Sequence, residues 1–169
     1  NEERVLAATL QRARQPGVDE LIVVDGGSTD ATRAIAAELA DIVCSAPRGR
    51  ATQMNTGAAR ARGDILLFLH ADTWLPPAAA DHVRAACAAP DVIGGRFDVQ
   101  LEPSTPLLWL TGKLINLRSR LSRIATGDQA IFIRRTVFEQ LAGYADVPLM
   151  EDIDLTRRMK RVGRSACLR

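Results

Sequence analysis

The sequence predicts a single α/β domain in which helices cover both faces of a mostly parallel central sheet. Two apolar runs, 20–25 and 65–69, are expected to be buried strands because they are rich in Val, Ile and Leu. Segments with helical periodicity separate such runs along the chain, an alternation typical of parallel strands joined by helices. A length of 169 residues suits one domain, and neither a repeat nor a low-complexity linker divides it.

Charged residues, glycine and proline indicate where the predicted helices begin and end. Two glutamates begin the first helix, where the dipole favours negative charge. Gly63 ends another, and Pro76 and Pro77 begin a third at positions that proline tolerates. The alternation of apolar and polar residues over 97–101 predicts a half-exposed strand. In chain order the expected elements are a helix over 2–14, strand 20–25, helix 29–40, strand 41–44, helix 50–62, strand 65–69, helix 76–89, strand 97–101, helix 107–124, a helix from Glu151 and a strand from about Gly163.

The composition argues against several classes of protein. A formal net charge of +2 is too small to indicate a nucleic-acid partner, and no run approaches the roughly 18 apolar residues of a membrane span. Cys44, Cys87 and Cys167 lie far apart without CxxC spacing, which favours reduced thiols in a cytoplasmic protein over disulfides or a zinc site. No GxGxxG motif follows a strand, which argues against a dinucleotide-dependent dehydrogenase.

A polar turn follows the first predicted strand. Asp25 ends the apolar run, Gly26 and Gly27 come next, and Ser28 opens an Ala-rich segment. Ligands of open α/β sheets bind at the carboxyl edge, where the Asp25 carboxylate can accept hydrogen bonds from a base or a ribose. The alternative is a turn in which the glycines supply only backbone freedom. The segment alone leaves both interpretations open.

Further polar residues follow the second strand and precede the helix between the two strands. His70 and Asp72 are separated by one residue, so on an extended chain they point to the same side. Asp72 is the natural ligand for Mg²⁺ or Mn²⁺, which prefer oxygen, and His70 the weaker one; alternatively, Asp72 only caps a turn. Arg48 and Arg50 flank a glycine before a helix, where they can grip an anion. Asn55 is either a binding residue or an ordinary helix residue.

Four segments form an ordered set: 24–30, 48–58, 70–72 and 151–155. Over nearly the whole chain, their order and spacing resemble family 2 inverting glycosyltransferases of the GT-A fold. Segment 127–132 and the Arg-Gly-Arg sequence are similar to the small bacterial subgroup associated with radical-SAM or selenium-domain proteins and arsenosugar biosynthesis. The resemblance implies one GT-A-like, Rossmann-like domain over residues 1–169. It also implies truncation at both ends, since family members have a strand before the first motif and further segments after the last.

The resemblance assigns expected roles to individual residues. Asp72 would bind the metal, although its motif begins with His70 where the family usually has Asp, which leaves metal dependence open. Asp152 and Glu151 would be catalytic. The residues expected to contact the donor nucleotide are Glu2, Asp25, Gly27, Arg48, Arg50, Asn55, Asp64 and His70, and those expected on the acceptor side are Gly127, Asp128 and Gln129.

Inverting transfer needs a base and a stabilised leaving group. An acceptor hydroxyl must lose its proton as it attacks, so a positioned carboxylate serves as general base. The departing diphosphate gains charge, which a divalent cation and arginines stabilise. Glu151 and Asp152 meet the first need, and the family pattern favours Asp152, with Asp128 as a further candidate. Without the other motifs, two acids at a helix start are explained by the dipole alone.

The segment 107–124 is expected to be an amphipathic helix, because leucines recur every three or four residues and lysine and arginine fall between them. It could dock on the inner membrane surface and meet a lipid-linked acceptor, or pack on the domain or on a second subunit.

The sequence therefore predicts sugar transfer from a nucleoside-diphosphate sugar to a hydroxyl of a lipid-linked or small-molecule acceptor. Two alternatives stay open. A nucleotidyltransferase would need a basic loop after the first strand, where this chain has Asp25-Gly26-Gly27-Ser28. A non-catalytic sugar-nucleotide-binding domain is made plausible by His70.

Overall fold

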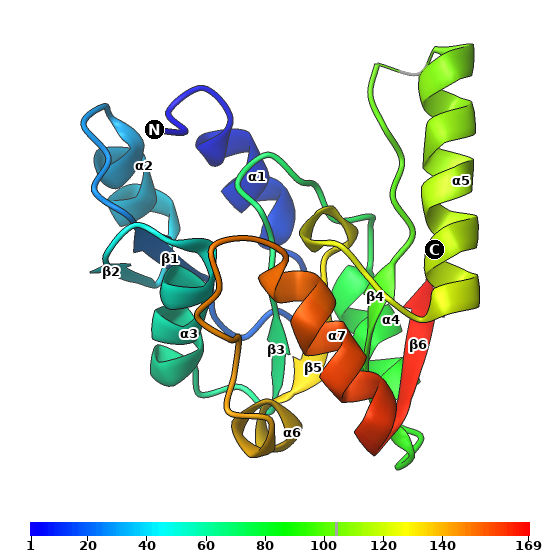
Figure 1. The fold of residues 1–169 in the computed structure, drawn as a ribbon. Helices are drawn as coiled ribbons and strands as arrows, with labels where there is room; N and C mark the ends of the chain where they lie inside the picture. The colour runs from blue at the N-terminus through cyan, green and yellow to red at the C-terminus, as the bar shows by residue number, and fades with distance from the viewer. Residues whose placement is uncertain (104) are drawn as a thin grey trace.

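In the computed structural model, which describes residues 1–103 and 105–169, helices and strands alternate along the chain (Figure 1). The predicted α/β class is confirmed. The helices are α1 (Leu6–Ala13), α2 (Thr32–Leu39), α3 (Arg50–Arg60), α4 (Ala79–Cys87), α5 (Pro106–Ser122), α6 (Arg135–Gln140) and α7 (Glu151–Val162), with a 3₁₀ turn η1 (Gly127–Gln129). The strands are β1 (Ile22–Asp25), β2 (Ile42–Ser45), β3 (Ile65–Leu67), β4 (Val92–Phe97), β5 (Phe132–Arg134) and β6 (Arg164–Leu168).

The strands form two hydrogen-bonded groups. β1 pairs with β2 in parallel, and the other four lie in the order β3-β5-β4-β6. β4 and β6 are parallel, whereas β5 runs antiparallel to both of its neighbours. The direction of β5 follows from the turn before it. η1 lies at the carboxyl edge of the sheet, so the chain enters β5 from that edge, with Phe132 opposite Leu67 at the end of β3.

The strand predicted over 97–101 is wrong except at its first residue. The observed strand is β4, which is buried along its whole length and ends at Phe97. The alternating residues that follow form an extended segment leading towards α5, where the Asn116 amide donates to and accepts from the backbone of Val99 at 2.9 and 2.8 Å. Alternating polarity indicates an extended backbone. The hydrogen bonds of such a backbone can be made by a side chain of a helix, as here, as well as by a neighbouring strand.

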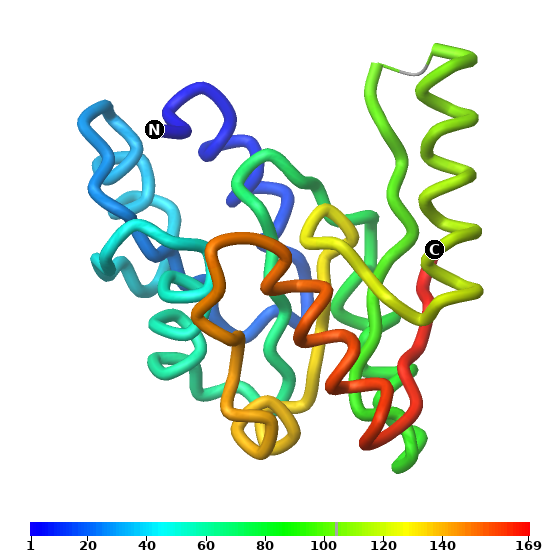
Figure 2. The backbone as a smooth tube through the Cα atoms, in the orientation of Figure 1, coloured from blue at the N-terminus to red at the C-terminus, as the bar shows by residue number. Residues whose placement is uncertain are grey.

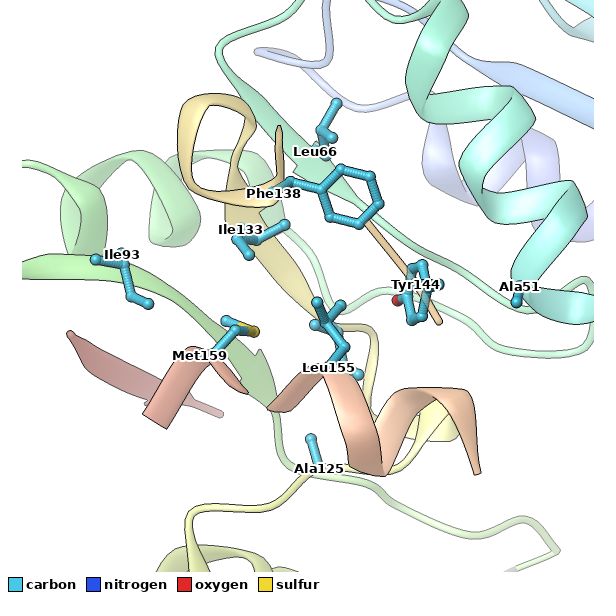
Figure 3. Packing of buried hydrophobic residues seen from close by; sticks show 10 residues of the cluster. Ala51, Leu66, Ile93, Ala125, Ile133, Phe138, Tyr144, Leu155 and Met159 are labelled. Atoms are coloured by element: carbon cyan, nitrogen blue, oxygen red, sulfur yellow. The ribbon is translucent and has the colours of Figure 1, made fainter. Parts of the chain in front are cut away.

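Helices cover both faces of the four-stranded sheet. On one face, Ile133 of β5 and Leu66 of β3 pack with Phe138 of α6 and Leu155 and Met159 of α7 (Figure 3). The other face packs against α4; the buried residues there are Ala79, Val83, Cys87, Val92, Phe97, Ala130 and Phe132. This double cover fixes β3 and β5, whose ends carry the polar loops described below.

A smaller cluster joins the first helices to the β1–β2 pair. Leu6 and Leu10 of α1 and Ala36 of α2 are its buried members, and Val23 and Val43 pack against them. The backbone trace in Figure 2 shows α5 at the opposite side of the molecule, beside the segment that leads into it. Among the described residues, no helix is both long enough and apolar enough to cross a membrane.

Candidate active site

The carboxyl ends of β1 and β3 open onto one cavity of about 1060 Å³ that extends between the two strands. Three loops form its polar rim: the turn after β1, the loop before α3 and the loop after β3. Six residues that the sequence predicts as site residues line this rim: Asp25, Gly27, Arg48, Arg50, His70 and Asp72. The structure thus brings together groups from three separate segments of the chain.

Asp25 is buried at the end of β1 and organises its own turn. Its carboxylate accepts hydrogen bonds from the backbone N–H groups of Gly27 and Ser28, each at 3.1 Å. Burial raises the pKa of Asp25, but the hydrogen bonds from Ser28 and Gly27 outweigh burial, so the pKa lies below its ordinary value. Gly27 has φ +95°, which glycine adopts without strain, and the space beside its α-carbon is open. The turn therefore presents bare backbone beside an ionised carboxylate.

The basic part of the rim is exposed. Gly49, at φ +145°, precedes α3, so that Arg50 is the first residue of the helix and Arg48 lies just before it. Both side chains are exposed at the end of the helix where unpaired N–H groups favour an anion. Glu2 also lines the cavity, and its backbone N–H donates to Thr32 Oγ1 at 2.7 Å at the start of α2.

His70 and Asp152 meet at Gly127, although they come from opposite halves of the chain. The His70 ring lies so close to the Gly127 α-carbon that a side chain there would overlap Nε2 and Cε1. The Gly127 N–H donates to Asp152 Oδ2. The loop after β3, η1 and the start of α7 therefore share one small region, and a side chain at position 127 would require the His70 ring to move.

The two adjacent acids have different surroundings. Glu151 is 3% exposed, whereas Asp152 is half-buried and accepts from Gly127 and from the backbone N–H of Ile153. Tyr144 is also buried. Burial, and then the charges of Asp152 and Glu151, raise the pKa of its phenol far above the ordinary value. Of the pair, Asp152 is the carboxylate that reaches the surface near the rim.

Asn55 connects α3 to the turn that carries Tyr144. Its amide donates to the Tyr144 carbonyl and accepts from the Tyr144 N–H, both at 2.9 Å. Arg158 of α7 secures the same turn by donating to the carbonyls of Leu141 and Gly143. The Asn55 side chain is thus engaged with backbone, so its observed contacts are structural.

Two other residues predicted for the site lie apart from the rim. The Asp64 side chain is fully exposed before the amino end of β3, at the other end of the cavity, where Arg135 is 3.6 Å away. Gln129 is 1% exposed, accepts from Ser119 Oγ at 3.0 Å and forms a capping box with Thr126. Asp128, between Gly127 and Gln129, is half-buried on the same turn.

The metal-binding potential of the rim depends on Asp72, which is exposed two residues after His70. In the part of the chain that the structure describes, no three His, Cys, Asp or Glu side chains are grouped as a metal site. A single carboxylate nevertheless fits Mg²⁺ or Mn²⁺ when substrate phosphates complete the coordination. Asp72 can supply that carboxylate, while Arg48 and Arg50 on the same rim can pair with the phosphates.

Sequence reasoning missed Tyr144 and Thr156 as supports of this region. Thr156 Oγ1 lies 2.9 Å from the Asp152 carbonyl and accepts from the Ala125 N–H at 3.3 Å, which ties α7 to the loop before η1. Tyr144 is the single tyrosine of the chain and directly follows Gly143, which was the available signal in the sequence. Thr156 carried none, since a threonine inside a helix is unremarkable in sequence.

Residues 1–141 match the family model described as "Glycosyl transferase family 2". The chain is also similar to the probable glycosyltransferase YdaM of Bacillus subtilis (strain 168), with 27% identity over 170 residues. That alignment covers 85% of this chain and 40% of the relative.

Two solved structures show the same fold. The mannosyltransferase PcManGT from Pyrobaculum calidifontis, in complex with GDP-Man and Mn²⁺, superposes with a TM-score of 0.74 at 24% identity, over 99% of this chain and 51% of that one. Glucosyl-3-phosphoglycerate synthase from Mycobacterium tuberculosis, in complex with UDP, gives a TM-score of 0.71 at 21% identity, over 99% and 66%. The fold is therefore GT-A-like, and the chain spans about half or less of PcManGT and YdaM.

Proposed function

The chain belongs to glycosyl transferase family 2, and from this premise we propose that it carries the donor-binding and catalytic part of an inverting glycosyltransferase. The observation that carries the proposal is the meeting of His70, from the donor rim, and Asp152, from α7, at Gly127. In the proposed binding mode, a sugar that projects from a nucleotide bound on the rim would lie beside this carboxylate.

A nucleoside-diphosphate sugar would bind along the rim. Asp25 accepts hydrogen bonds from the base or the ribose through lone pairs that its own turn leaves free. Arg48 and Arg50, together with the start of α3, receive the diphosphate. The GDP-Man and UDP bound by the two structural neighbours support a nucleotide of this class.

The transfer step assigns the proton to Asp152. The acceptor oxygen attacks the anomeric carbon from the face opposite the diphosphate, the bond from that carbon to the diphosphate oxygen breaks, and the hydroxyl proton passes to the Asp152 carboxylate. The Gly127 N–H holds this carboxylate in place. Asp128 lies on the same turn as Gly127, and its proposed role is to face the acceptor.

A divalent cation, when bound, would neutralise charge that develops on the leaving diphosphate. Asp72 is the residue proposed to hold it, with His70 alongside. The Mn²⁺ in the PcManGT complex supports a metal of this type. The finer resemblance, to the radical-SAM and arsenosugar-associated subgroup, remains a proposal based on segment 127–132.

Calorimetry with UDP, GDP and dTDP, with and without Mn²⁺, tests the donor site. Asp25→Ala is expected to weaken the bound nucleotide by about 1–3 kcal/mol, because a buried hydrogen bond to a charged group is lost. Asp41→Ala is the matched control, since Asp41 pairs with Arg14 away from the rim. Unchanged affinity in Asp25→Ala would remove Asp25 from the site.

Turnover of a panel of nucleotide sugars tests the chemistry. Release of nucleoside diphosphate that depends on an acceptor supports transfer. Tight nucleotide binding without turnover, for any donor and acceptor, would instead identify a sugar-nucleotide-binding domain without catalysis. Release of pyrophosphate on incubation of a nucleoside triphosphate with a sugar phosphate would identify a nucleotidyltransferase.

A further inference from the structure

Helix α5 carries a stripe of leucines on its outer side. These residues are spaced alternately by three and four positions, which places them on one side of a helix. Each is between 49% and 78% exposed. Figure 1 shows α5 at the margin of the molecule, beyond β4 and β6. The leucine stripe consists of Leu107, Leu110, Leu114, Leu117 and Leu121.

The opposite side of α5 fixes the direction in which the stripe points. Gly112 packs against the backbone of Val99, and Asn116 forms its two hydrogen bonds with that residue. Ser119 is fully buried, and its hydroxyl lies 2.7 Å from the Ile124 carbonyl oxygen and 3.0 Å from Gln129 Oε1. Because these contacts hold the inner side of α5 against the domain, the leucine stripe points away from it.

Positive charge lines both margins of the stripe. The sequence has no acidic residue between Glu102 and Asp128, but it has four basic ones. Lys113 and Arg118 are exposed on the two sides of the stripe, and Lys113 Nζ lies 5.6 Å from the centre of the exposed Trp109 ring. Arg120 is paired with Asp98. The outer side of α5 is therefore aliphatic in the middle, cationic at its margins and aromatic at one edge.

This distribution argues against a second copy of the chain. Leucines at such spacing can form a seam between two helices, and charges beside the seam then decide which helices pair. In a homodimer the positions beside the seam would bring the exposed Lys113 and Arg118 of one copy against basic residues of the other in either helix direction. Like charges at such positions are destabilising.

We infer that the leucine stripe of α5 docks on an anionic lipid bilayer. Leucines enter the acyl boundary, lysine and arginine extend along the margins to lipid phosphates, and the indole sits at the interface. The helix has 17 residues, which at 1.5 Å each gives about 25 Å of contact lying in the plane of the membrane. The inference stands on the surface of α5 and does not depend on the proposed function.

Flotation with vesicles tests this inference. The protein is expected to float with vesicles that contain phosphatidylglycerol and to bind pure phosphatidylcholine vesicles roughly tenfold less, because basic residues contribute to binding only at an anionic surface. Salt at about 0.5 M should weaken binding by screening these charges. Leu110→Gln/Leu117→Gln should reduce binding by about tenfold or more, and Lys113→Glu/Arg118→Glu by a similar factor.

Matched variants control for hydropathy and net charge. Val147→Gln/Val162→Gln changes two exposed apolar residues outside α5, and Arg60→Glu/Arg161→Glu makes the same charge change on α3 and α7. Both should bind vesicles as the parent does, and circular dichroism should show the same helix content in every variant. Absence of vesicle binding, or binding that the α5 variants leave unchanged, would overturn the inference. A leucine-dependent dimer in sedimentation, or capture of an acidic helical peptide in place of vesicles, would likewise overturn it.

Discussion

The two strand groups of this molecule organise their polar residues in different ways. In the β1–β2 unit, the carboxylate of the rim is held by its own turn: Asp25 accepts from residues two and three positions later. In the four-stranded unit, contacts join distant segments. Asn55 meets Tyr144 across 89 positions, and Gly127 meets Asp152 across 25. The first arrangement makes a rim of turns and bare backbone, and the second fixes one carboxylate in place.

This difference suggests a division of work. A nucleotide can be bound by a rim of turns, since backbone N–H groups and exposed arginines tolerate small movements. A general base must be held more tightly, because small displacements are costly to catalysis. Variants in the four-stranded unit should therefore affect chemistry and stability most, and variants near β1 should affect binding and titration.

The largest expected effect is on turnover. Asp152→Asn keeps the shape of the side chain but removes its basicity, so turnover should fall by about 10²–10⁴-fold while nucleotide affinity stays near the parent value. Steady-state kinetics and calorimetry on the same preparation measure the two quantities. Glu151→Gln should have a smaller effect, and Asp154→Asn, which loses only the pair with Arg158, serves as the control on the same helix.

The opposite ranking would reassign the base. Near-parental turnover in Asp152→Asn together with collapse in Glu151→Gln would give the role to Glu151. If both variants remained active, Asp128 would be the next carboxylate to replace.

A smaller effect, on stability, compares two amides of the same helix. Asn55→Ala removes both hydrogen bonds to the Tyr144 backbone, and the free energy of unfolding should drop by about 2–3 kcal/mol. Gln53→Ala removes one bond, from Gln53 Nε2 to the Val24 carbonyl of β1, and should cost about 1 kcal/mol. Urea unfolding of the two variants checks the order. Equal losses would mean that the two strand groups are held with equal strength.

The close contact between Gly127 and His70 predicts a loss of stability that a second substitution should reverse. Gly127→Ala would put a methyl group into the His70 ring, and overpacking of this kind costs roughly 1–3 kcal/mol. His70→Ala in the same chain should recover most of that loss, so the two substitutions should be non-additive by about 1 kcal/mol or more. Thermal or urea unfolding of both single variants and the double variant completes the cycle. Simple additivity would show that His70 and Gly127 do not touch in solution.

The sequence could predict what local patterns determine. The alternation of strands and helices, the turn at Asp25 and the rim residues at the ends of β1 and β3 follow from runs of adjacent residues, and the family and fold are confirmed. Strand β5 could not be predicted in the same way. It has three residues, and its place between β3 and β4 depends on pairing across the sheet.

The candidate site shows the same difference between features set by local sequence and features set by contacts between distant segments. Adjacent acids at a helix start point about 100° apart, so the pattern could not tell which one is buried until the packing of α7 was known. For Asn55, a polar residue on a helix was compatible with either role, and the structure places its partner 89 residues away. What was not predictable in each case is a contact between distant segments.

The smallest expected effect concerns acid titration at β1. The pKa of Asp25 is below its ordinary value in the folded chain, so the ionised carboxylate contributes stability at neutral pH. Because the folded pKa lies below the unfolded one, that contribution is present above an unfolded pKa of about 3.9 and is lost as pH falls through the folded value. Asp25→Asn retains one acceptor oxygen and should lower the free energy of unfolding by about 1 kcal/mol at neutral pH. The difference between parent and variant should shrink as pH falls from about 5 to about 2, which urea unfolding at several pH values can follow. A constant difference across that range would mean that the ionisation of Asp25 is not coupled to folding, and that the turn after β1 is held by its glycines and backbone alone.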